Sequence, residues 1–278
     1  MILRNDNEIS HCTFEHIEAA KGVHHLFTTR LGGASEGAYS SMNLSALTGD
    51  NPDVVMQNYY RIASLGFPVE SMVFSKQSHG CRVRQITAED RGKGIVRDCD
   101  YKGIDGLVTN DPSVTLVTFY ADCVPLYFYD PVKRAIGLSH AGWRGTVGQI
   151  GAKTLQSMAD HYDSDPVDIL VGIGPSICKS CFEVGNEVAE EFAQAFDFAS
   201  DFIVSCGKKP DKSYIDLQGI NRQSLICAGI PAENIELSGM CTKENTDLFY
   251  SHRAMGLKRG TLAAFMRLDD AEGHRGAR

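Results

Sequence analysis

The chain has 278 residues, of which 43% are hydrophobic and 22% are charged, and its formal net charge is −8 at pH 7. This length and composition predict a globular protein with a sizeable core. An acidic chain without a clustered basic stripe is a poor candidate for binding nucleic acid. No apolar run resembles a signal peptide or a transmembrane helix, so we expect a cytoplasmic protein without membrane partners.

The expected helices are marked by their capping residues. Asn51, Pro52 and Asp53 supply an N-cap side chain, a proline at the first helical position and an acid in the first turn. Apolar residues then recur at helical spacing as far as Leu65, and Gly66 supplies the stop. Further helices are expected over about 146–162, over 183–196 and from 216 to 229.

The expected strands are short runs rich in β-branched and aromatic residues. They lie at 24–30, 72–79, 105–110, 114–122, 125–131, 134–142 and 168–176. Several of them follow one another with only turns between, so the chain does not alternate strands and helices. We therefore predict a single mixed α/β domain over residues 1–278, with a largely antiparallel β core flanked by helices. A polar, frayed tail is expected from about residue 268 to 278.

One predicted hairpin carries two chemically interesting residues. The segment "YDPVKR" places an aspartate before a proline, followed by charged residues, which is typical of a turn. At the open end of the hairpin, Cys123 and His140 would lie roughly opposite each other. His79 is expected at the end of another strand, beside Gly80, which allows a sharp turn. Two histidines and a cysteine with an open fourth position form a catalytic zinc pattern, but spacing alone leaves metal binding and a structural role equally open.

The chain has nine cysteines, an odd number, and a length that does not require disulfides, so free thiols are expected. Most are predicted to be small buried hydrophobic residues, namely Cys12, Cys81, Cys99, Cys206, Cys227 and Cys241. Cys178 and Cys181 form a C-x-x-C pair, which could be a redox couple or half of a metal site. Because no second C-x-x-C or H-x3-H pair completes a closed zinc site, we favour an adventitious pair of loop thiols.

The flanking residues add a family resemblance. The blocks "FTTRLGGASEGAYSSMNLS", "KQSHG", "DGLVT", "ADCVPLYFYDP", "SHAGWRGT", "GIGPSI" and "FEVG" occur in this order between about Phe27 and Phe265. They resemble the laccase-domain, or multicopper polyphenol oxidoreductase, family, whose members are now mostly regarded as zinc-dependent purine nucleoside enzymes. The resemblance implies a single mixed α/β domain related to cysteine hydrolases, with His79, Cys123 and His140 as the metal ligands.

The resemblance also implies two activities on purine nucleosides. One is phosphorolysis of adenosine or inosine, with methylthioadenosine as a further candidate substrate, to the free base and ribose 1-phosphate. The other is deamination of adenosine to inosine, for which zinc lowers the pKa of a bound water. Phosphorolysis needs an anion site, and Arg30 and Arg144 are the candidates because each lies in a Gly-containing turn.

Three further residues are candidates with an open alternative. Asp122, beside the cysteine, could carry a proton or orient one of the two histidines, or it could be a structural carboxylate bonded to turn amides. Asn43 and Gln77 stand in family blocks and could hydrogen-bond ribose or base. Structural roles in turns are nearly as plausible for both.

Other classes of function remain open at this stage. A copper polyphenol oxidase would need H-x-H pairs, which the chain lacks, although copper could bind the Cys/His2 set in vitro. A cysteine hydrolase acting on a cell-wall precursor would use Cys123 as nucleophile and His79 or His140 as base. A non-catalytic binding module would not require three ligands at strand ends.

Overall fold

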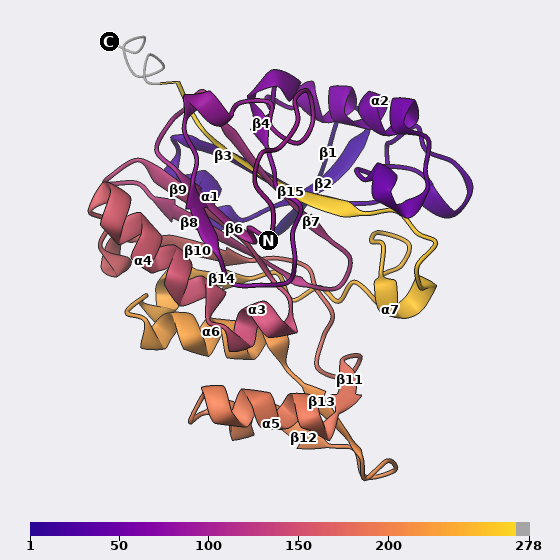
Figure 1. The fold of residues 1–278 in the computed structure, drawn as a ribbon, viewed down its shortest axis with the longest axis vertical. Coiled ribbons are helices and arrows are strands. Elements are labelled where there is room, and N and C mark those ends of the chain that lie inside the picture. The colour runs from indigo at the N-terminus through magenta and orange to yellow at the C-terminus, as the bar shows by residue number, and fades with distance from the viewer. Residues whose placement is uncertain (271–278) are drawn as a thin grey trace.

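The computed structural model describes residues 1–270, in which the strands form two six-stranded sheets and one three-stranded sheet (Figure 1). In spatial order, the first sheet contains β1 (Ile2–Asp6), β2 (Ile9–Thr13), β3 (Val23–Thr28), β15 (Leu262–Leu268), β7 (Thr115–Tyr120) and β4 (Met72–Val73). The second contains β14 (Ile235–Leu237), β10 (Leu170–Ile173), β8 (Val124–Asp130), β9 (Ala135–Ala141), β6 (Gly106–Thr109) and β5 (Val83–Gln85). The third contains β11 (Glu183–Gly185), β13 (Lys212–Ile215) and β12 (Ile203–Ser205).

Most neighbouring strands run antiparallel, as the sequence predicted. The edge strands β4, β5 and β14 are the ones that pair in parallel, with β7, β6 and β10. The predicted mixed, largely antiparallel α/β fold is therefore confirmed. Its extent to residue 278 stays a prediction, because residues 271–278 lie outside the described part of the chain.

The two large sheets pack against each other and helices cover their outer faces. Along β15, Leu262, Ala264 and Met266 join a buried cluster with side chains of β8 and β9. The alternate residues Ala263 and Phe265 pack instead with helix α2 (Pro52–Ala63), as the two-residue period of a strand requires. Helices α4 (Ile150–Tyr162) and α6 (Leu217–Cys227) pack on the other side of the second sheet. Figure 1 shows α2 and this helical layer on opposite sides of the strands.

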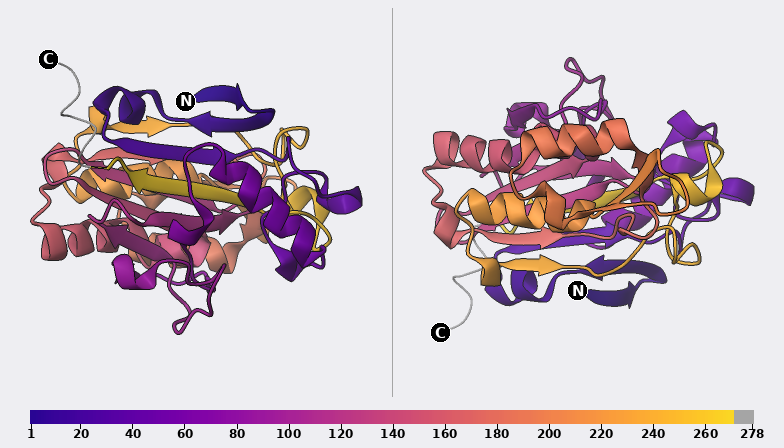
Figure 2. Two further views of the ribbon diagram at one scale, coloured as in Figure 1. Left: turned by 90° about the horizontal axis from the view of Figure 1, so that it is seen from above. Right: turned by 90° about the horizontal axis from the view of Figure 1, so that it is seen from below.

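The remaining helices are shorter or more peripheral. They are α1 (Glu15–Ala20), α3 (Trp143–Val147), α5 (Asn186–Ala195) and α7 (His252–Met255). Seen from below, α5 and α6 lie across the strands of the second sheet (Figure 2). No helix within residues 1–270 is both long and apolar enough to cross a membrane.

The predicted hairpin is confirmed as β8 and β9, with Pro125 opposite His140. The carboxylate of Asp130 accepts the backbone N–H groups of residues 132 and 133, both at 2.9 Å, and so builds the predicted turn. Cys123 directly precedes β8. The hairpin therefore carries Cys123 to His140, as the sequence indicated.

Two of the four predicted helices form as expected. Asn51 caps α2 by accepting the N–H of Asp53, and Gly66 follows with a φ of 95°. Asp216 caps α6 by accepting the N–H of Gly219.

The other two predictions were wrong in part. The helix expected over 146–162 is divided into α3 and α4, because Gln149 adopts a left-handed backbone conformation with a φ of 57°. The helix expected over 183–196 begins only at Asn186. Its first three residues form β11, which pairs with β13.

Two further expectations are corrected by pairing across the fold. The strand expected over 72–79 ends at Val73 in β4, and a loop carries the chain on to His79. The tail expected to fray from residue 268 is ordered at its start, because Leu268 is buried in β15 and the N–H of Asp269 donates to the carbonyl of Gly22. The rest of the expected tail, residues 271–278, lies outside the described residues.

Candidate metal centre

The three predicted ligands converge at the open end of the β8–β9 hairpin. The ligand atoms of His79, Cys123 and His140, hereafter the ligand cluster, lie within 4.8 Å of one another. The two imidazole rings are 4.8 Å apart and inclined at 81°. His140 is buried, Cys123 is partly buried and His79 is exposed, so the ligand cluster opens to solvent on the His79 side. The structure thus brings these residues together, and their role as ligands stays a prediction.

The backbone beside the ligand cluster leaves little room for an additional side chain. Gly142 follows β9, and a Cβ atom there would lie 3.1 Å from Cδ2 of His79 and 3.2 Å from Sγ of Cys123. Its φ of −68° is ordinary for any residue, so lack of space, and not backbone conformation, favours glycine here. This glycine lets the start of α3 pass directly beside the three ligands.

Asp105, which the sequence analysis did not single out, joins two of the ligands. Its Oδ1 accepts the backbone N–H of His79 at 2.9 Å and lies 3.0 Å from Nδ1 of His140. Its Oδ2 accepts the N–H groups of Ser78 and Gly80, at 3.1 and 3.0 Å. The side chain is completely buried. A carboxylate at the beginning of an apolar strand was the available signal, because a buried charge needs partners.

The close packing of charges changes the proton affinity of the ligand cluster. Burial raises the pKa of the Cys123 thiol, but the neighbouring His140 and His79 outweigh burial and lower it to about 6. Burial lowers the pKa of His140, whereas the Cys123 thiolate and Asp105 raise it to about 9. Without a metal, Cys123 and His140 therefore favour a thiolate–imidazolium pair. The thiolate is the form that binds metals and attacks electrophiles.

The Asp122 side chain makes no hydrogen bond to either histidine of the ligand cluster. Its Oδ1 accepts the hydroxyl of Thr242 at 2.7 Å, and its Oδ2 accepts the N–H of Arg253 at 2.6 Å. Of the roles left open for Asp122, these contacts favour the structural carboxylate. The orienting role falls to Asp105.

The two candidate amide side chains are engaged in holding turns. Asn43 is completely buried, and its Oδ1 accepts the N–H groups of Ser45 and Thr261. Gln77 donates to the carbonyl of Phe119 and accepts its N–H, at 3.1 and 2.7 Å. These hydrogen bonds favour the structural alternative for both residues. Those of Gln77 hold the loop before His79 against the end of β7.

The two candidate arginines differ in their freedom. The Nη1 of Arg30 donates to the carbonyl of Thr246 at 2.9 Å, and its guanidinium lies 4.9 Å from the ring centre of Tyr250. Arg144 is exposed on α3, two residues after Gly142. Its guanidinium stacks on the Trp143 ring, 4.2 Å from the ring centre. Arg144 is thus the freer of the two to meet an anion.

A third arginine, Arg259, escaped the sequence analysis because no motif surrounds it. Its Nη1 donates to the carbonyl of Gly260 at 2.8 Å, while its buried Nε has no partner among the described residues. Burial lowers the pKa of its guanidinium, and the negative charges of Asp122 and Cys123 partly offset this effect. Arg259 therefore lies near the ligand cluster with a hydrogen-bond donor to spare.

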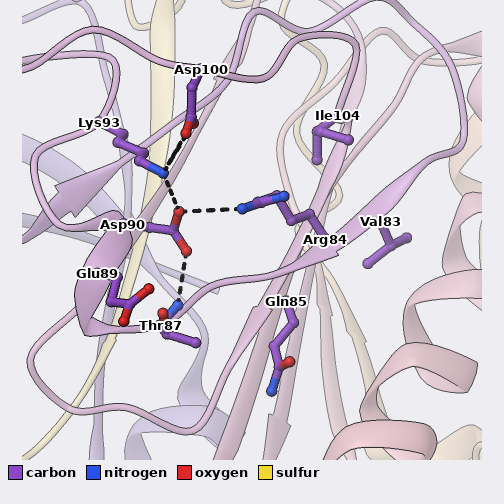
Figure 3. Close-up of a pocket in the computed structure, with 9 residues that line it drawn as sticks. All are labelled: Val83, Arg84, Gln85, Thr87, Glu89, Asp90, Lys93, Asp100 and Ile104. Atoms are coloured by element: carbon purple, nitrogen blue, oxygen red, sulfur yellow. Dashed lines mark hydrogen bonds and ion pairs between the residues drawn. The ribbon is translucent and has the colours of Figure 1, made fainter.

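A separate polar depression is filled by its own ion pairs (Figure 3). Asp90 accepts hydrogen bonds from Nζ of Lys93, the N–H of Thr87 and Nη2 of Arg84, at 2.8, 3.1 and 3.4 Å. Lys93 also donates to Asp100 at 3.1 Å. None of the lining residues belongs to the ligand cluster. Since Asp90 pairs with both Lys93 and Arg84, the depression stabilises its loops and is a weak candidate for a second substrate site.

Comparison with known proteins identifies the family. Residues 24–269 match the family model described as multi-copper polyphenol oxidoreductase laccase. The chain belongs to this family. The purine nucleoside phosphorylase YlmD of Bacillus subtilis is 38% identical over 247 residues, which cover 88% of each chain. The adenosine deaminase RL5 of an unknown prokaryotic organism is 36% identical over 246 residues, covering 87% of this chain and 93% of RL5.

Solved structures show the same fold for this laccase-family chain. The hypothetical protein YfiH of Bacillus licheniformis superposes with a TM-score of 0.89 and 34% identity, covering 96% of this chain and 99% of YfiH. YlmD of Geobacillus stearothermophilus superposes with a TM-score of 0.88 and 32% identity, covering 97% and 99% of the two chains. The expected relationship to cysteine hydrolases stays a prediction.

Proposed function

We propose that this laccase-family protein is a zinc-dependent enzyme of purine nucleosides. It cleaves adenosine or inosine with phosphate to the free base and ribose 1-phosphate, and it deaminates adenosine to inosine. The observation that carries the proposal is the ligand cluster, a Cys/His2 set that is open to solvent on one side. The names of similar proteins, purine nucleoside phosphorylase and adenosine deaminase, support the choice of substrate.

The donor set of the ligand cluster fits zinc. One thiolate and two imidazoles with a fourth position open form a common arrangement of catalytic zinc sites. The depressed pKa of Cys123 supports this assignment, because a metal binds the deprotonated sulfur. When bound, zinc would supply a Lewis acid and lower the pKa of a water molecule. The same donors also bind copper, so the identity of the bound metal has to be measured.

The protein's own groups orient the ligands and bind the anion. Asp105 accepts a hydrogen bond from Nδ1–H of His140, so Nε2 is the nitrogen that would give up its proton when a metal binds. Arg144 presents an exposed guanidinium just beyond Gly142, and Arg259 offers an unused Nε–H near Cys123. Both guanidinium groups suit the negatively charged oxygens of phosphate.

A cysteine hydrolase is the second candidate, and one observation favours it. The thiolate–imidazolium pair of Cys123 and His140 is also the arrangement of an activated cysteine nucleophile. In that reaction the sulfur would attack a carbonyl carbon of a cell-wall precursor and the imidazole would protonate the leaving amine. The names of the similar proteins give this candidate no support, so it ranks below the nucleoside enzyme.

Product analysis of purified protein with measured metal content tests the proposal. Adenosine and inosine are supplied with and without phosphate, and wild type is compared with His79→Ala and with Cys227→Ser, a control at an exposed thiol. We expect phosphate-dependent release of adenine and hypoxanthine, phosphate-independent conversion of adenosine to inosine, and loss of both in His79→Ala alone. Zinc-loaded protein that turns over neither nucleoside would refute the proposal. Metal-independent amide hydrolysis that requires Cys123 would establish the hydrolase instead.

A further inference from the structure

A second group of metal-binding side chains lies outside the ligand cluster. Sulfur atoms of Cys178, Cys181 and Cys241 and a carboxylate oxygen of Glu244 all lie within 4.8 Å of one another. Cys178 and Cys181 belong to the connection between β10 and β11, whereas Cys241 and Glu244 belong to the segment between β14 and α7. We call these four residues the thiolate cluster. The fold brings its two halves together from positions 63 residues apart in the chain.

The two halves of the thiolate cluster share a ligand spacing and one backbone hydrogen bond. Each is a C-x-x-ligand turn, with "CKSC" in the first half and "CTKE" in the second. In each turn the carbonyl of the leading cysteine accepts the N–H of the residue four positions later, Phe182 at 3.0 Å and Asn245 at 3.1 Å. Paired turns that each present two ligands are the pattern of closed zinc sites. The sequence analysis missed the second turn because its last ligand is a glutamate.

One sulfur of the thiolate cluster accepts a backbone hydrogen bond, although burial raises the pKa of both Cys241 and Cys181 above that of a free thiol. The backbone N–H of Cys178 donates to the sulfur of Cys241 at 3.3 Å. Hydrogen bonds of this kind stabilise the charged form of their acceptor. The Cys181 sulfur and the Ser180 hydroxyl lie 3.5 and 3.4 Å from Oε1 of Glu244.

We propose that the thiolate cluster is a second metal site, closed by four protein ligands and occupied by zinc. At a zinc–sulfur distance of about 2.3 Å, tetrahedral ligands stand about 3.8 Å apart, so the ligand atoms need only a small contraction. Thiolate-rich sets favour zinc among the abundant divalent ions. Three cysteines at one point can form one disulfide and would leave the third sulfur and Glu244 without a partner.

The thiolate cluster is connected by hydrogen bonds to Asp122, the residue before Cys123 of the ligand cluster. Thr242, beside Cys241, donates to the carboxylate of Asp122, and Ile177, beside Cys178, donates to the Asp122 carbonyl at 2.9 Å. Asp122 in turn precedes Cys123. A metal in the thiolate cluster would therefore hold in place both segments that bind Asp122. The role of this metal would be structural, whereas the ligand cluster keeps an open position.

Metal counting on the full chain tests the proposal, with zinc as the probe. Wild type should contain two zinc ions per chain by mass spectrometry. His79→Ala should contain one, Cys178→Ser with Cys181→Ser should contain one, and Cys227→Ser should contain two. A wild-type content of one that His79→Ala abolishes would overturn the second site and leave the proposed function standing. A wild-type content of one zinc ion that is retained in His79→Ala would support the second site and overturn zinc binding at the ligand cluster.

Cobalt spectroscopy separates a four-ligand site from chance binding to thiols. In the His79→Ala background only the thiolate cluster reports, and Co²⁺ should give tetrahedral bands with sulfur-to-metal charge transfer. Glu244→Cys should keep the site and intensify the charge-transfer band, because it adds a fourth sulfur, whereas Glu244→Ala should weaken cobalt binding. These single variants disturb folding less than the double cysteine change. Identical spectra and cobalt affinities in Glu244→Cys and Glu244→Ala would refute the proposal. A disulfide among the three cysteines of freshly purified protein would refute it as well.

Discussion

Replacing Asp105 by asparagine should uncouple the two histidines of the ligand cluster. An amide keeps the shape of the carboxylate, but one of its two oxygens becomes an NH2 group. If that group faces His140, the ring must accept at Nδ1, and Nε2 then carries the proton and cannot bind a metal. If it faces the other way, the N–H groups of Ser78 and Gly80 lose their acceptor and the loop before β5 is released.

The structure sets the size of this effect. Asp105 is completely buried, so water does not replace a lost acceptor. A hydrogen bond to a charged group contributes about 1.5–3 kcal/mol, and either orientation of the amide disrupts at least two of those that Asp105 accepts. We therefore expect about 3–6 kcal/mol of lost folding stability before the structure relaxes. Loss of a carboxylate behind a ligating histidine typically weakens metal binding by about 10- to 100-fold, or about 1.4–2.7 kcal/mol.

Zinc affinity and unfolding, measured together, check the prediction. Affinity is read by competition with a chromophoric chelator, in a Cys178→Ser, Cys181→Ser background so that only the ligand cluster reports. Asp90→Asn is the matched control, because Asp90 is also buried and accepts several charged hydrogen bonds, but at the separate polar depression. The control should lose stability and keep its zinc affinity. Equal zinc affinity in Asp105→Asn and wild type would refute the reasoning.

Three other changes probe the site and the fold. Gly142→Ala should weaken zinc binding, because its Cβ would crowd Cys123 at 3.2 Å, whereas Gly207→Ala, which meets nothing within 4 Å, should not; equal chelator competition in both would contradict this. Arg259→Gln should raise KM for phosphate and leave deamination unchanged, and an unchanged KM would remove Arg259 from the anion site. Burial lowers the pKa of His25 to about 4, so its contribution to stability is complete above about pH 6.5 and is lost as the pH falls toward 4. Between pH 7 and pH 5 the free energy of unfolding should fall by about 2 kcal/mol. Urea unfolding should show this fall in wild type and not in His25→Phe; the same dependence on pH in both proteins would mean that another group is responsible.

What the sequence predicted well was local in the chain. Cys123 and His140 were placed together because a single turn at Asp130 sets the register of β8 and β9. The capped start of α2 depended on adjacent residues in the same way. Such features are written in short segments, where propensity and capping act without help from the rest of the fold.

What the sequence could not show depends on distant contacts. His79 reaches the ligand cluster through a loop fixed by Asp105, 26 residues later. The division between α3 and α4 at Gln149, and the full burial of Asn43, likewise follow from packing that no local pattern reports. Glu244 joined three cysteines only once the fold had brought two turns together.

The unequal burial of the three ligands indicates how a substrate would approach. His140 is fixed from behind by Asp105 and lies against Tyr120 at a ring distance of 5.4 Å. That side of the ligand cluster is closed by the core. His79 is exposed and its backbone is held through its N–H, so its ring borders the open side of the ligand cluster. Arg144, also exposed, follows Gly142 on α3. A substrate would therefore approach the ligand cluster from the His79 side, and Arg144 lies two residues after Gly142, whose backbone borders the cluster.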